Sequence, residues 1–125
     1  MENRTIDKLI AVHLFSWKKW TFHNPSRSGG IAFSHEGLVP PEYDGSDLQH
    51  LSMIMPHYSS DIAAAWMVVE KLIELGFYPA IWIKPGVVQV YDKDERCIVE
   101  EKAAVPMAIC LAALKAVGVE VDHLS

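Results

Sequence analysis

The sequence has few of the features that would tie a protein to secretion, to nucleic acid or to a membrane. It contains only two cysteines, Cys97 and Cys110, too few for a disulfide scaffold, and we expect both to be reduced thiols. The net charge of −5 argues against general nucleic-acid binding. The longest apolar run is shorter than a membrane span, and the N-terminus lacks the pattern of a secretion signal. These absences predict a cytoplasmic protein that binds neither nucleic acid nor membranes.

The composition is that of a globular domain. Half of the 125 residues are hydrophobic and 22% are charged, as in ordinary folded proteins. Because one domain usually spans 100–200 residues, we expect residues 1–125 to form a single compact domain. Residues 18–57 show little periodicity, and such irregular stretches often carry function or are mobile.

Three helices are predicted from apolar residues at helical spacing, over residues 6–17, 61–75 and 106–117. His13 falls on the apolar stripe of the first helix, and we expect it to be half-buried rather than a ligand. The second helix is apolar most of the way round. Its main core-facing stripe is expected to be Ile62, Trp66, Val69 and Ile73.

Strands are predicted over residues 77–84, 87–92 and 96–104, which form an antiparallel meander joined by short polar or Pro-Gly turns. A further hairpin is expected from residues 20–23 and 31–34, on either side of a turn-rich connection. The predicted fold class is therefore α/β, of the α+β type, with an antiparallel sheet sandwiched or covered by about three helices.

The motifs that mark enzymes and metal sites are absent. The chain has no HExxH, paired CxxC, GxSxG, GxGxxG or GxxxxGK[ST] pattern. The run from His57 to Asp61 is typical of a helix cap rather than of a catalytic triad, since triads are assembled in space. We therefore expect no enzymatic activity and no cofactor or metal. The alternative is a small enzyme whose long loop brings together His35, Glu36, Asp44, Asp47, His50 and His57.

Two weaker patterns indicate ligand binding. Basic residues in the first part of the chain could form a phosphate-binding patch, namely Arg4, Lys18, Lys19 and Arg27. Aromatic side chains on the predicted strands could line a groove that stacks a flat ring, although ordinary core packing explains them as well. The candidate ligand-binding residues drawn from both patterns are Trp20, Arg27, Trp82, Tyr91 and His57.

Two helical stretches carry a resemblance to a known family. Residues 56–72 follow the pattern P-x-x-S-x-D-I-x-x-A-W-x-V-V-E-K-L, and residues 108–118 follow A-I-C-x-A-A-L-K-A-x-G. The chain is similar in these motifs to the phage ABA sandwich domain family of small phage and prophage proteins, over roughly residues 5–118. The resemblance implies helices packed against an antiparallel sheet, and it implies no known reaction. Residues 23–57 depart from any pattern of the family.

The resemblance and the missing catalytic motifs together predict a small non-enzymatic phage accessory protein. We expect it to bind a host protein or a small molecule, and one form of this role is a counter-defence protein that sequesters a nucleotide signal. The alternatives are the small enzyme described above and a minor structural component of the virion. Because the second and last helices are apolar on most of their circumference, we also expect a homodimer through the exposed edge of the second or last helix, with Met67 and Met107 filling the contact.

Overall fold

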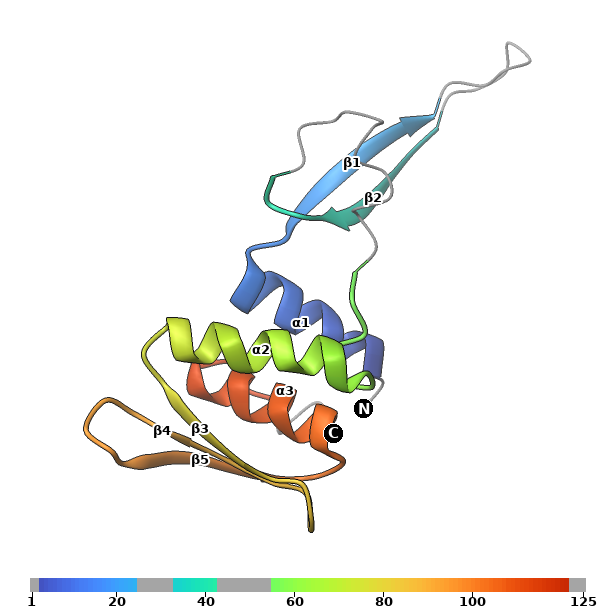
Figure 1. Cartoon of the computed structure of the whole chain (residues 1–125). Helices are drawn as coiled ribbons and strands as arrows, with labels where there is room; N and C mark the ends of the chain where they lie inside the picture. Colours follow the sequence, from blue (N-terminus) through green and yellow to red (C-terminus); the bar gives the residue numbers. More distant parts are fainter. Residues whose placement is uncertain (1–2, 25–32, 43–54, 122–125) are drawn as a thin grey trace.

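The structure, a computed structural model, describes residues 3–24, 33–42 and 55–121 (Figure 1). Three helices are present in this part of the chain: α1 (Asn3–Phe15), α2 (Ile62–Glu74) and α3 (Val105–Ala116). Five strands alternate with them: β1 (Lys18–Asn24), β2 (Phe33–Val39), β3 (Tyr78–Trp82), β4 (Val87–Tyr91) and β5 (Cys97–Lys102). The predicted helices and the predicted meander are confirmed, with ends that differ by a few residues.

The strands β3, β4 and β5 form an antiparallel sheet with β4 in the centre. Side chains alternate between its two faces, so Val88 and Val90 of β4 are buried against the helices. The helix α3 packs on β4 and β5, and α2 packs beside it against β3. Figure 1 shows all three helices on one side of this sheet. The α+β fold class is confirmed, in the form of a sheet covered by helices.

An ion pair fastens α3 to the sheet. Glu101 of β5 lies opposite the inward-facing Val88 in the sheet register, and its carboxylate pairs with Lys115 of α3. The other side of α3 is covered by α1 and α2. As a result, six side chains of α3 are buried: Ala108, Ile109, Cys110, Ala112, Ala113 and Leu114.

The helix α2 begins and ends as its sequence predicts, but it turns a different side to the core. The Asp61 carboxylate accepts a hydrogen bond from the Ala63 N–H at 3.1 Å, and Gly76 adopts a φ of +97° after the last turn. The core-facing residues are Ala64, Ala65, Val68, Val69 and Leu72. The prediction was wrong for three of the four stripe residues: Ile62, Trp66 and Ile73 are 52%, 51% and 57% exposed.

The helix α1 also differs from its prediction at two polar positions. His13 is exposed rather than half-buried, because the buried side of the helix is formed by Ile6, Ile10 and Leu14. On this buried side lies Asp7, which is fully buried. A charged side chain in such a place needs partners, and the partners of Asp7 form part of the site described below.

The strands β1 and β2 form the predicted hairpin, which is longer than expected. Part of the segment predicted to be irregular, residues 18–24 and 33–39, is thus regular structure. Figure 1 shows the hairpin projecting beyond α1, away from the three-stranded sheet. The connection between its strands and residues 43–54 lie outside the described residues. No helix among the described residues is long and apolar enough to cross a membrane.

Candidate functional site

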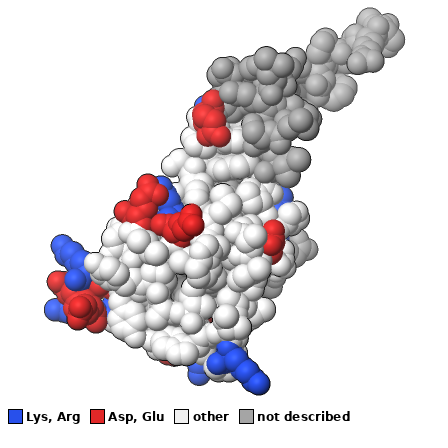
Figure 2. All heavy atoms as spheres, in the orientation of Figure 1, with Lys and Arg blue, Asp and Glu red and all other residues white. Residues whose placement is uncertain are grey.

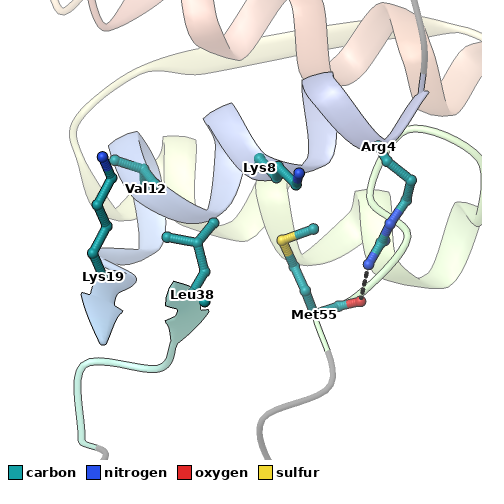
Figure 3. Close-up of a pocket in the computed structure, with 7 residues that line it drawn as sticks. Arg4, Lys8, Val12, Lys19, Leu38 and Met55 are labelled. Atoms are coloured by element: carbon teal, nitrogen blue, oxygen red, sulfur yellow. Dashed lines mark hydrogen bonds between the residues drawn. The ribbon is translucent and has the colours of Figure 1, made fainter. Parts of the chain in front are cut away.

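A pocket of about 560 Å³ lies between α1 and the base of the β1–β2 hairpin. Its volume falls in the range of small-molecule sites. The described residues that line it come from α1, the hairpin and the segment before α2: Arg4, Lys8, Val12, Lys19, Gly37, Leu38 and Met55. Figure 3 shows the side chains of Arg4, Lys8 and Val12 along one side of α1, with Leu38 and Met55 facing them.

The local structure explains why these side chains converge. Arg4, Lys8 and Val12 are spaced four residues apart on a helix, which places them in a row on one face. In the hairpin, Lys19 lies directly opposite Leu38 in the strand register. Directly opposed residues of an antiparallel pair share a face. The row on α1 and this pair on the hairpin therefore form two walls of one pocket.

The pocket is strongly basic. Its described lining includes three cationic side chains and no carboxylate. Among the described residues, Lys8 and Lys19 form no ion pair, so their charges are directed to the pocket and the solvent. The remaining side chains, Val12, Leu38 and Met55, supply an apolar floor. This combination suits a ligand that has both a negative charge and an apolar part.

Arg4 is held in place by the chain that leads into α2. Its guanidinium donates to the carbonyl oxygens of Met55 and Pro56, each at 3.3 Å, and pairs with the Asp7 carboxylate at 3.0 Å. Asp7 also accepts a hydrogen bond from the Ser59 N–H at 2.8 Å. The Ser59 hydroxyl in turn donates to the Asn3 carbonyl at 3.0 Å. The start of α1 is thereby tied to residues 55–59, and Arg4 is preorganised at the edge of the pocket.

Two buried protic groups lie beside Asp7. The Tyr58 ring stacks on Phe15 with centroids 5.2 Å apart. Burial raises the pKa of Tyr58 to about 12, and Cys110 and Asp7 add to the shift. Burial also raises the pKa of the Cys110 thiol, with a further contribution from Asp7. Both groups therefore stay neutral at physiological pH, as expected next to a buried carboxylate, and neither is set up as a nucleophile.

The structure places the predicted binding residues in several different regions. Trp82 and Tyr91 lie on the face of the three-stranded sheet that points away from the helices, at opposite ends of the β3–β4 pair. Trp82 pairs with Val87, and Tyr91 pairs with Tyr78. Tyr91 donates a hydrogen bond to Gln89 and contributes to a second pocket, of about 420 Å³, with Tyr78, Lys93 and Glu95.

His57 is exposed in the turn before α2, Trp20 lies on β1, and Arg27 is outside the described residues. Of the predicted residues whose side chains are described, Trp82, Tyr91 and His57, none lines the basic pocket.

The predicted basic patch is closer to the pocket. Two of its members, Arg4 and Lys19, line it, whereas Lys18 does not. Sequence reasoning missed Lys8, although its spacing of four residues from Arg4 was a usable signal. The polar residues of the alternative enzyme are only partly described: His35 and Glu36 lie on β2, and Asp44, Asp47 and His50 fall outside the described residues. Among the residues that the structure describes, no group of three or more His, Cys, Asp or Glu side chains could hold a metal ion.

Comparison with protein families matches the phage ABA sandwich domain to residues 8–114 of the chain. The chain belongs to the phage ABA sandwich domain family. The match confirms the resemblance carried by the two helical motifs, and it includes six of the seven described residues that line the pocket; Arg4 precedes it. No curated protein and no solved structure matches the chain.

Proposed function

We propose that this phage-family protein acts by binding a small anionic ligand in the pocket between α1 and the β1–β2 hairpin. The observation that carries the proposal is the convergence of Arg4, Lys8 and Lys19 around an apolar floor. Cations that converge on one concave site attract anions, and the low-dielectric wall strengthens that attraction.

The two kinds of lining define the class of ligand. Phosphate or carboxylate oxygens accept charge-assisted hydrogen bonds from guanidinium and ammonium groups. A ring or aliphatic part fits against Val12, Leu38 and Met55. A nucleotide has both parts. A phage protein that sequesters a nucleotide signal of the host, as a counter-defence, is the form of this function that best suits the pocket.

We propose binding without catalysis. The described lining provides positive charge and apolar contact, and it contains none of the His, Cys, Ser, Asp or Glu side chains that most often act as nucleophile or general base. The guanidinium of Arg4 is held by three oxygen atoms of the chain. Because Asp7 balances the charge of Arg4, the uncompensated positive charge of the pocket comes from Lys8 and Lys19.

The test uses a fluorescent anion with apolar rings, 8-anilinonaphthalene-1-sulfonate, and competes it with inorganic phosphate, nucleoside monophosphates and cyclic dinucleotides. We expect saturable binding of the dye and its displacement by at least one nucleotide. The double variant Lys8→Glu/Lys19→Glu should weaken binding about tenfold or more, because each lysine contributes a hydrogen bond to a charged group.

The matched control is Lys84→Glu/Lys93→Glu. It makes the same change in net charge, but it does so in the turns of the three-stranded sheet. The control should bind the dye and the nucleotides as the wild type does. Equal binding by the wild type and by Lys8→Glu/Lys19→Glu would contradict the proposal. Native mass spectrometry of the protein purified from host cells then identifies a ligand that stays bound, and a duplex DNA included in the competition should not displace the dye.

A further inference from the structure

An exposed apolar stripe runs along α2. Its members are Ile62, Trp66 and Ile73, each about half exposed, and Val69, which is buried at its base. Figure 2, in the orientation of Figure 1, shows acidic and basic side chains grouped over one end of this face, with a broad uncharged area beside them. Exposed apolar patches of this kind are often functional.

The edges of the neighbouring sheet are protected against association. Pro79 of β3 lies opposite Val90 of β4 and has no N–H to donate, and proline is found in sheets mainly on edge strands such as β3. At the other edge, β5 has a register shift opposite Val90 and Tyr91 and carries Glu100, Glu101 and Lys102. Proline, bulges and charges are the devices that discourage strand pairing. No such device interrupts the stripe on α2.

We propose that the stripe on α2 is the contact surface for a second copy of this chain, with the two α2 helices packed antiparallel about a two-fold axis. The stripe residues are spaced four, three and four positions apart. The order of these spacings is the same from either end of the helix, so two antiparallel copies can align all four positions. In an antiparallel pair, Ile62 of each copy therefore meets Ile73 of the other, and Trp66 meets Val69.

The shapes of the side chains match this register. Trp66 protrudes, being 51% exposed, whereas Val69 is recessed at 5%. A large, exposed side chain on each copy thus faces a smaller one on the other, as in the side-chain packing of paired helices. The spacing of four and three is also that of a coiled-coil seam. The stripe is complementary to itself, which is what a two-fold contact requires.

The size of the stripe fits the centre of a dimer interface. Three large side chains about half exposed offer on the order of 300 Å² of apolar surface, comparable to the largest patch on a typical monomer. A stable interface buries about 800 Å² on each partner, with an apolar centre and a polar rim. The exposed polar residues of α2 beside the stripe, Glu70 and Glu74, supply part of the rim.

The first experiment is light scattering coupled to size exclusion over a series of protein concentrations. We expect the mass to rise from 14.0 kDa to twice that value. The variant Ile73→Lys should remain a monomer. Its matched control, Ile83→Lys, changes a residue that is 81% exposed in the turn after β3 and should dimerise as the wild type does. Lys8→Glu/Lys19→Glu should also leave the mass unchanged, which separates this contact from the basic pocket.

The second experiment tests the register without disturbing the surface charge. In a Cys97→Ser background, Ile62→Cys mixed with Ile73→Cys should form a disulfide-linked dimer on mild oxidation. Either variant alone should not, because equivalent positions lie about 16 Å apart along the helix axes. A mass of 14.0 kDa at every concentration, a dimer that Ile73→Lys leaves intact, or crosslinking of either single variant alone as fast as of the mixture would each overturn the proposal.

Discussion

The helices α2 and α3 are similar in length and in their predominantly apolar composition, but they have different surroundings. They span 13 and 12 residues, and both are apolar on most of their circumference. Yet α3 lies between α1, α2 and the sheet, and its large side chains Ile109 and Leu114 are fully buried. The helix α2 lies at the margin of the same layer, so Ile62, Trp66 and Ile73 remain about half exposed.

The difference shows that an apolar helix becomes a core helix only when several layers meet on it. Small side chains favour this position for α3, since Ala108, Ala112 and Ala113 allow neighbouring elements to approach closely. The apolar residues of α2 that have no neighbour within the chain form a surface that a second molecule can cover. Four measurements test this comparison.

The largest effect is expected from one substitution made on both helices. Ile109→Ala should lower the free energy of unfolding by about 2–5 kcal/mol, because it leaves a cavity at a fully buried position. Ile73→Ala should lower it by less than about 1 kcal/mol in the monomer, because the side chain is mostly exposed. Urea denaturation at low protein concentration, followed by circular dichroism, measures both. Equal losses would remove the distinction between the two helices.

The next effect concerns the hydrogen bonds that tie the start of α1 to the segment before α2. Asp7→Ala should cost about 2–4 kcal/mol of stability, since it leaves the Ser59 N–H without its acceptor and removes the carboxylate partner of Arg4. Asp61→Ala, the same substitution at the exposed N-cap of α2, should cost about 1 kcal/mol. Thermal and urea unfolding measure the loss of stability in each variant. A larger loss for Asp61→Ala than for Asp7→Ala would contradict the prediction.

A smaller effect is expected from alkaline pH. The pKa of Tyr58 rises from 10.0 to about 12 in the folded protein because of burial. The folded state therefore holds this proton more tightly than the unfolded state, and the stabilisation present below pH 10 is lost as the pH rises towards 12. Cys110 acts in the same direction. Tyr58→Phe should make the fall in stability between these pH values shallower, as measured by urea unfolding at each pH.

The last prediction concerns the reactivity of the two thiols, which depends on their burial and involves no change in stability. Cys97, on β5, is exposed, whereas Cys110, on α3, is buried. A thiol reagent such as 5,5′-dithiobis(2-nitrobenzoic acid) should therefore modify one thiol in the native protein and the second only after unfolding. In Cys97→Ser no thiol should react under native conditions. Rapid reaction of both thiols in the native wild type would mean that α3 is not covered as the structure describes.

Much of the fold could be predicted because local patterns determine it. The helical spacing of apolar residues, the Asp61 cap and the alternating strands identified the main elements to within a few residues. The candidate site was only partly predictable. Arg4 and Lys19 belonged to the predicted basic patch, but they share a pocket with Leu38 and Met55 only because the base of the hairpin and the segment before α2 approach α1 in the folded chain. That approach involves residues far apart in the sequence, which no local pattern reports.

The register of β5 shows a similar limit. Simple alternation places Cys97 on the same face as Val99. In the structure Val99 pairs with Val90 and Cys97 pairs with Tyr91, so a shift of one residue separates them. A bulge of this kind depends on how the two strands meet, and the sequence of one strand does not show it.

The sequence by itself determined the fold class, the family and the order of helices and strands, since these follow from periodicity, caps and two specific motifs. Only the tertiary structure decided which side of α2 faces the core, that Asp7 rather than His13 is the buried polar group of α1, and where the cations converge. The physical reason is that hydropathy states whether a side chain favours burial, whereas burial itself depends on which neighbouring layer reaches it.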